Sequence, residues 1–180
     1  SMAAQMGRLF DYLECLPVDL ISIEKVEADD IISFVAQGLA GTGRKATIVS
    51  SDKDFLQIVK PGIEVYAPIK KRTITYENIL DEISVHPTNY LLTKALLGDN
   101  SDNLRGIKGL GIKTLIKEYP ELKTSDKIEL NFIYNRAEEK LDTKKIFARM
   151  VHDWNLVETN YNIMNLEDTQ LDENEKTHIM

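Results

Sequence analysis

Three groups of carboxylates lie at separate points of the sequence and constrain its fold more than any other feature. The groups are Glu27-Ala28-Asp29-Asp30, Ser51-Asp52-Lys53-Asp54 and Gly98-Asp99-Asn100-Ser101-Asp102-Asn103. Carboxylates that are gathered together repel one another and lose solvation, so a fold that brings them together needs a compensating positive charge. Hard divalent cations supply that charge and prefer oxygen ligands. The sequence therefore predicts a divalent-metal site wherever these segments converge.

The first two groups lie in a strand–helix–strand pattern. Residues 46–50 form a β-branched run typical of a buried parallel strand, and the second acidic group follows it directly. Residues 20–23 read as a short strand, and residues 28–40 as an amphipathic helix that begins after Glu27. Ligands bind beyond the carboxyl ends of parallel strands, and neighbouring strands lie only about 4.8 Å apart. We therefore expect the two groups to bracket one site.

Each acidic group alone has a simpler interpretation. Acids in a first helical turn favour the helix macrodipole, and an aspartate after a strand commonly caps the next helix. It is the joint occurrence of both groups with Asp99 and Asp102 that favours a metal site.

The rest of the chain reads as a hairpin followed by helices. The expected hairpin strands are 64–67 and 72–75, and the expected helices are 3–15, 76–83, 87–97, 112–119, 127–141 and 144–154. The tail, residues 158–180, reads as weakly structured. These elements predict an α/β fold in which helices flank a parallel sheet.

A glycine-rich turn, Gly106-Ile107-Lys108-Gly109-Leu110-Gly111, opens the predicted helix 112–119. Backbone N–H groups at a positive helix end bind phosphate, and Lys108, Lys113 and Thr114 add donors beside Arg105. A plain connector between helices also explains a lone glycine triplet. Binding through such a turn reads the nucleic-acid backbone, so it is independent of sequence and sensitive to salt.

Charge and composition narrow the classes of partner. The 180-residue chain has a net charge of −7, yet residues 103–149 carry 11 Lys and Arg against seven Asp and Glu. This basic middle is compatible with phosphate binding. The single cysteine and three scattered histidines argue against zinc and leave Mg²⁺ or Mn²⁺. No apolar run reaches the roughly 20 residues of a membrane span, so we expect no membrane partner.

In order and spacing, the three acidic groups and the turn resemble the 5′→3′ exonuclease/flap endonuclease superfamily. The similarity is greatest to phage ribonuclease H-type flap endonucleases and the 5′-nuclease domains of bacterial DNA polymerases. The resemblance implies a PIN-like α/β body over residues 1–83 and a helical part with a helix–hairpin–helix element over residues 84–180. It implies catalytic, metal-binding roles for Glu27, Asp29, Asp30, Asp52 and Asp54, with Asp99 and Asp102 completing the second-metal side.

The resemblance also implies a substrate and an activity. Its DNA-binding residues would be Arg105, Gly106, Lys108, Gly109, Gly111, Lys113 and Thr114. A K⁺ ion would bind backbone carbonyls of the same turn. The implied partners are duplex or flapped DNA and RNA/DNA hybrids, and the implied role is removal of RNA primers or 5′ flaps in the cytoplasm of a bacterial or phage-infected cell.

One departure from the family pattern lies at the start of the chain. Family members begin with a strand bearing a metal-binding aspartate, followed by a basic arch, and nothing before Glu27 matches either feature. We therefore expect this chain alone to cleave weakly or not at all, and a separate N-terminal fragment is one candidate partner. Two alternatives remain open: a non-catalytic duplex-DNA-binding module and a PIN-type ribonuclease.

Overall fold

A three-stranded mixed sheet lies at the centre of one half of the molecule. The computed structural model describes residues 2–179. Strand β1 (Ala46–Val49) runs parallel to β2 (Ile63–Ala67), and β3 (Arg72–Ile74) pairs with β2 in the antiparallel sense. The strand expected at 46–50 and the hairpin are confirmed. Because the order is β1-β2-β3, β1 forms one edge of the sheet.

Helix α2 (Ala28–Gly41) and the 3₁₀ helix η1 (Asp54–Ile58) pack against this sheet. Side chains of β1 alternate, so that Ala46 and Ile48 are buried while Thr47 and Val49 face outward. This alternation follows from the two-residue period of a strand. The segment after β1 and the start of α2 line a common cavity.

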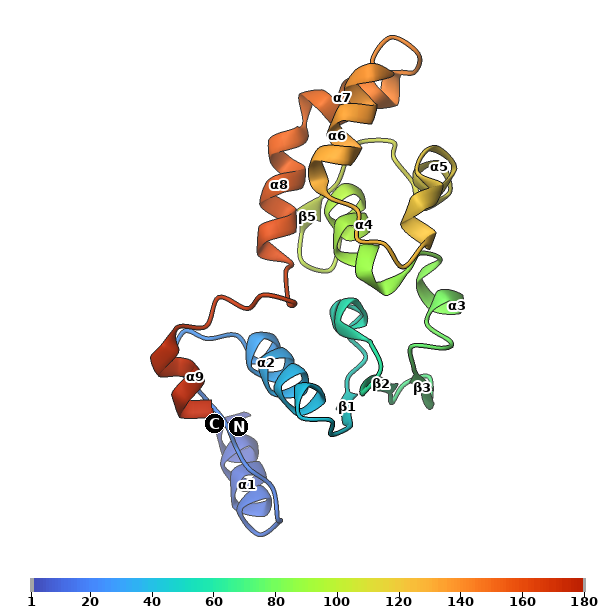
Figure 1. Ribbon diagram of the computed structural model, residues 1–180. Coiled ribbons are helices and arrows are strands. Elements are labelled where there is room, and N and C mark those ends of the chain that lie inside the picture. Colours follow the sequence, from blue (N-terminus) through green and yellow to red (C-terminus); the bar gives the residue numbers. More distant parts are fainter. Residues whose placement is uncertain (1, 180) are drawn as a thin grey trace.

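The second half of the molecule is helical, and Figure 1 shows α4 to α8 grouped away from the sheet. Its elements are α3 (Leu80–Ile83), η2 (Pro87–Asn89), α4 (Tyr90–Leu97), β4 (Gly98–Asp99), β5 (Leu104–Arg105), α5 (Ile112–Glu118), η3 (Pro120–Lys123), α6 (Leu130–Glu139), α7 (Lys145–His152) and α8 (Trp154–Ile163). Helix α4 packs against α8 and is buried from Tyr90 to Leu96. Near its start, Asn89 is buried and donates to the carbonyls of Thr124 and Asp126.

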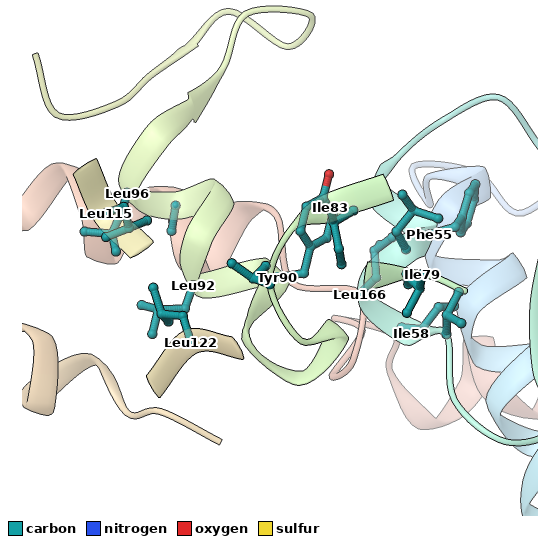
Figure 2. Packing of buried hydrophobic residues seen from close by; sticks show 14 of the residues in the cluster. Phe55, Ile58, Ile79, Ile83, Tyr90, Leu92, Leu96, Leu115, Leu122 and Leu166 are labelled. Atoms are coloured by element: carbon teal, nitrogen blue, oxygen red, sulfur yellow. The ribbon is translucent and has the colours of Figure 1, made fainter. Parts of the chain in front are cut away.

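One hydrophobic core joins the two halves. In Figure 2, Phe55, Ile58 and Ile79 lie toward the sheet, and Leu92 and Leu96 lie toward the helices. Tyr90 stands between these groups and belongs to the same core. Continuous burial of this kind holds the acidic segments of the two halves in a fixed relation.

The strand expected at residues 20–23 is wrong. This segment has no strand pairing, and Leu20 and Ile21 are 50% and 40% exposed. A strand exists only when its backbone N–H and C=O groups meet a neighbouring strand, and residues 20–23 face none within the part of the chain described. An apolar pattern alone does not supply the neighbouring strand that pairing requires.

The tail is more ordered than expected. Helix α8 extends to Ile163, and α9 covers Glu173–Ile179. Asp172 Oδ1 accepts hydrogen bonds from the Asn174 and Glu175 amides, while Glu175 Oε2 accepts one from the Asp172 amide at 2.7 Å. These reciprocal bonds form a capping box, a local signal that overall polarity does not reveal.

Two expected helices have different limits in the structure. The helix expected at 76–83 is reduced to α3, because the Asn78 side chain accepts from the Thr75 amide and turns the chain before it. The helix expected at 144–154 is divided at Asp153 into α7 and α8.

Helix α1 (Met2–Glu14), expected from its apolar spacing, is present but contributes no buried residue along its described length. Met6, Leu9 and Phe10 are each about half exposed. No helix within residues 2–179 is both long and apolar enough to cross a membrane.

Candidate metal and nucleic-acid site

Five of the predicted carboxylates line one cavity of about 300 Å³. They are Glu27, Asp29, Asp52, Asp54 and Asp102. The opposite wall is apolar and comprises Leu104, Ile163, Met164 and Leu166. The structure therefore brings together side chains from α2, from the segment after β1 and from the β4–β5 turn, as the sequence predicted for a shared site.

The start of α2 presents its acids without using them as caps. Glu27 occupies the N-cap position with extended backbone (φ −73°, ψ 143°), and its side chain makes no capping hydrogen bond. Asp29 lies in the first helical turn and also lines the cavity. Acids at this end of a helix interact favourably with the helix dipole, as the simpler interpretation states. Both side chains nevertheless line the cavity together with the other acids.

The acids after β1 form a local turn and also line the acidic cavity. Asp52 Oδ1 accepts a hydrogen bond from the Asp54 amide at 2.8 Å, which fixes the turn into η1. This is the local bond expected of an aspartate after a strand. Asp52 and Asp54 nevertheless line the cavity, so a turn-forming role does not remove them from it.

Asp99 and Asp102 approach the site from the β4–β5 hairpin. One carboxylate oxygen from each of Asp54, Asp99 and Asp102 lies within 4.8 Å of the others, a spacing that suits a shared cation. Asp99 is fixed by the Ser101 amide, which donates to its Oδ1 at 2.8 Å. Asp99 and Asp102 thus extend the acidic site beyond Asp54, toward the β4–β5 hairpin.

Asp30 lies apart from this arrangement. It is not among the residues that line the acidic cavity. Burial raises its pKa, and the nearby charges of Glu27 and of Glu175 on α9 add to the rise. Asp30 therefore faces the junction between α2 and α9.

The electrostatics of the cavity favour a bound cation. Burial raises the pKa of Asp29, and the negative charges of Asp52 and Glu27 raise it further. Burial also raises the pKa of Asp54, although Lys94 opposes this effect. Carboxylates whose ionised forms are penalised in this way gain the most when a positive ion enters.

Lys94 contacts the acidic site although the sequence did not predict it there. It lies on α4, is only 6% exposed, and places its Nζ 2.7 Å from Asp99 Oδ2 while also contacting Asp54 Oδ1. Burial would lower the pKa of Lys94, but its bonds to Asp54 and Asp99 raise it. For Asp99, burial is likewise outweighed by the bonds from Lys94 and Ser101, and its pKa falls to about 2.

The glycines of the turn have packing roles that the structure makes explicit. A Cβ on Gly98 would lie 2.2 Å from the Gly106 amide nitrogen, and one on Gly106 would lie 2.0 Å from the Leu97 carbonyl carbon. Gly98 also has a positive φ of 76°. Only glycine permits these two backbones to approach so closely. This approach brings Asp99 and the turn beside α4.

The turn 106–111 buries two apolar side chains in the core and exposes its other residues to a varying degree. Ile107 and Leu110 are buried, and the Ile107 amide donates to the Leu96 carbonyl at 2.9 Å. From α7, Arg149 Nη1 donates to the Lys108 carbonyl at 3.0 Å. Gly109 has a φ of 83°, as a tight turn requires. Among the predicted DNA-binding residues, the side chains of Arg105, Lys108, Lys113 and Thr114 are exposed.

Comparisons with known proteins give the family. Residues 1–84 match the family described as 5′-3′ exonuclease, N-terminal resolvase-like domain. The 5′-3′ exonuclease of Buchnera aphidicola is 36% identical over 142 residues, which is 77% of this chain and 47% of that protein. The chain is a homologue of the 5′→3′ exonucleases and flap endonucleases. Flap endonuclease Xni of Colwellia psychrerythraea is 34% identical over 59% of this chain and 38% of its own length.

The 5′-nuclease relationship extends to the fold. A bacteriophage T5 flap endonuclease, solved in complex with DNA and metal ions, superposes with a TM-score of 0.71 at 19% identity. The match covers 92% of this chain and 61% of the T5 chain. The predicted α/β class is therefore confirmed as a 5′-nuclease fold. The chain spans about half the length of the curated 5′-3′ exonucleases it matches.

The donor set fits the metals of this class of nuclease. Every cavity-lining group that carries charge is a carboxylate, and the cluster of three aspartates lies at ligand spacing. Oxygen-only donors suit hard divalent ions. The acidic cavity is therefore compatible with metal binding.

Proposed function

We propose that this chain is the metal-binding and duplex-binding part of a 5′ nuclease that hydrolyses phosphodiesters. The observation that carries the proposal is the convergence of five carboxylates, from three separate segments, on a single cavity of about 300 Å³. Gathered carboxylates repel one another, so a divalent cation in this cavity would be favourable. Homology to 5′→3′ exonucleases gives that cation a function.

Two divalent ions, Mg²⁺ or Mn²⁺, would activate a water molecule and stabilise the leaving oxygen of the phosphodiester. We assign Glu27, Asp29, Asp52 and Asp54 to the first side of this site. Asp99 and Asp102 would hold the second side, where they approach Asp54. Asp30, which faces Glu27 and Glu175, would support the first side from the flank.

The substrate would lie across the turn 106–111. We propose that a helix–hairpin–helix unit formed by α4, this turn and α5 belongs to a DNA-binding part, residues 84–180, while residues 1–83 form part of the nuclease body. The exposed Arg105, Lys108, Lys113 and Thr114 would contact phosphates. Gly106, Gly109 and Gly111 would keep the turn close to the backbone of the nucleic acid. By the same resemblance, a K⁺ ion would bind backbone carbonyls of the turn.

The biological substrates would be 5′-flapped or duplex DNA and RNA/DNA hybrids, as in primer removal in the bacterial or phage-infected cytoplasm. The names of the Buchnera and Colwellia relatives, a 5′-3′ exonuclease and a flap endonuclease, support the 5′-end and flap part of this assignment. Contact through phosphates would make binding insensitive to base sequence and weaker as salt rises.

We further propose that the 180 residues alone cleave slowly. A slot of about 630 Å³ separates the segment 19–26 from the edge strand β1 and from α2. Apolar side chains line it, and β1 offers unpaired backbone groups along that side. An additional strand from an N-terminal segment of a 5′ nuclease would fill this slot and end beside Asp52. We expect such a segment, in one polypeptide or as a separate fragment, to raise the cleavage rate.

The test combines metal binding with nuclease assays. Isothermal titration with Mn²⁺ would compare the wild type with Asp52→Asn, which keeps the shape of the side chain and removes its charge. Asp142→Asn is the matched control, because Asp142 is exposed between α6 and α7 and far from the cavity in sequence. We expect the Kd for Mn²⁺ to rise by about tenfold or more in Asp52→Asn and to stay unchanged in Asp142→Asn.

The same variants separate the nuclease from a non-catalytic duplex-binding module. The nuclease requires slow, Mn²⁺-dependent cutting of a 5′-flap substrate that Asp52→Asn abolishes. Retained duplex binding together with Mn²⁺ affinity that is equal in wild type and Asp52→Asn would reject the nuclease and favour the module. Cutting of single-stranded RNA in preference to flapped DNA would favour a PIN-type ribonuclease instead.

A further inference from the structure

The buried lysine in the acidic site has no place in the scheme above, and its position suggests one. Lys94 lies in the most completely buried stretch of α4, between Leu91 and Leu96. Its Nζ lies 2.7 Å from Asp99 Oδ2 and contacts Asp54 Oδ1. A buried charge is retained only when it is paired, and both partners here are predicted metal ligands.

The ammonium group therefore shares its partners with the candidate cation site. Asp54 and Asp99, together with Asp102, present oxygens within 4.8 Å of one another. A divalent ion held by Asp54 and Asp99 needs the same lone pairs that Lys94 now engages. Two cations that share ligands at this distance also repel each other, and the low dielectric of a half-buried site strengthens the repulsion.

We propose that Lys94 is a built-in counter-cation of the second-metal side. In the absence of metal it holds Asp54 and Asp99 in position, and it competes with an entering divalent ion for their oxygens. Lys94 is a positioning residue in this scheme, because it acts through the two aspartates. The inference rests on the proposed function in one respect only, the assignment of these carboxylates as metal ligands.

This role has two consequences that a merely structural lysine lacks. Removing the charge of Lys94 should strengthen metal binding, because the competitor is gone and the site is more negative. It should also destabilise the metal-free protein, because Asp54 and Asp99 lose their buried partner. The loss should then be largely recovered when a divalent ion replaces the ammonium group.

The experiment compares Lys94→Met with Lys127→Met. Methionine keeps the apolar stem of the side chain and removes the charge. Lys127 is the matched control, because it pairs with Glu167 at 3.0 Å on the surface and neither residue lines the acidic cavity. Isothermal titration with MnCl₂ should give a Kd about tenfold lower, or lower still, for Lys94→Met than for wild type, and no change for Lys127→Met. In EDTA, Lys94→Met should melt below wild type, and Mn²⁺ should raise its Tm by more than it raises that of wild type.

Each outcome decides the question. Equal or weaker Mn²⁺ binding by Lys94→Met, with a Tm deficit that Mn²⁺ does not reduce, would overturn the proposal. Tight Mn²⁺ binding by Lys94→Met and none by wild type would support competition while contradicting the metal-binding function of the unmodified chain. Failure of both proteins to bind Mn²⁺ would overturn both proposals.

A measurement on the wild type covers the case in which Lys94→Met does not fold. In protein labelled with ¹⁵N-lysine, the buried Lys94 Nζ should give a protected ammonium resonance that shifts as Mg²⁺ is added. The shift should saturate with metal binding and be absent in Asp54→Asn. A Lys94 resonance unaffected by Mg²⁺ at saturation would overturn the proposal.

Discussion

The helical half and the first 27 residues contain similar apolar side chains, but the helical half buries them and the N-terminal residues expose them. Helices α4 to α8 place Leu96, Leu115 and Phe147 at 1% exposure or less. In the N-terminal segment, Leu9 and Phe10 are 47% and 50% exposed, and α1 buries no residue along its described length. The apolar side chains of the helical half therefore contribute to the shared core, whereas those of α1 stay largely exposed.

The two regions also differ in how polar groups are satisfied. In the helical half, buried Asn160 donates to the carbonyls of Ala95 and Arg105, which joins α8 to α4 and to the hairpin. Segment 20–23 has no comparable cross-link within the described chain, and its backbone lies outside any sheet. A neighbouring strand in the slot beside β1 would offer that backbone hydrogen-bond partners.

The largest expected effect comes from truncating one phenylalanine in each region. Phe147→Ala removes a ring that is 1% exposed and should lower the free energy of unfolding by about 3–5 kcal/mol. Phe10→Ala removes a half-exposed ring and should change it by about 0.5 kcal/mol or less. Urea unfolding monitored by circular dichroism would measure both. Comparable losses in the two variants would show that α1 is packed in solution and would break the comparison.

A smaller effect is expected from the polar cross-link. Asn160→Ala leaves two carbonyls without their donor and should cost about 1–3 kcal/mol. Asn155→Ala is the control, because Asn155 is exposed on the same helix, and it should fall within about 0.5 kcal/mol of wild type. Because Asn160 also fixes the strand that carries Arg105, duplex binding should weaken in Asn160→Ala at temperatures where the protein stays folded. An Asn160→Ala protein as stable as Asn155→Ala would contradict the cross-link.

Sequence patterns predicted the elements whose signals are local. The β-branched run at 46–50 and the helix after Glu27 have a strong period, and both are present as β1 and α2. Residues 20–23 carry the same kind of pattern but form no strand, because pairing depends on a neighbour that periodicity cannot supply. The capping box at Asp172 and Glu175 shows the converse: a local signal was present but was hidden by the mixed polarity of the tail.

The sequence predicted the acidic residues of the candidate site but not the buried lysine, Lys94, that contacts them. Asp52, Asp54 and Asp102 follow turns or strands, so their convergence can be anticipated from the topology. Lys94 sits in an apolar helix five residues before Asp99, and nothing in that spacing states that its stem is buried and its ammonium faces two aspartates. A lone lysine among leucines was the available signal. Its meaning depends on the tertiary contact between α4 and η1.

The smallest expected effect concerns the outer edge of β1, which faces the N-terminal segment across the slot. Val49 is 68% exposed there, so Val49→Lys should change the free energy of unfolding by about 0.5 kcal/mol or less. A charged side chain on an edge strand nevertheless discourages pairing with another strand. Val49→Lys should therefore reduce concentration-dependent self-association in sedimentation velocity runs, whereas the neutral β-branched control Val49→Thr should behave as wild type. A stability loss of more than about 1 kcal/mol in Val49→Lys alone would mean that this edge is already covered in solution, most simply by the N-terminal segment itself.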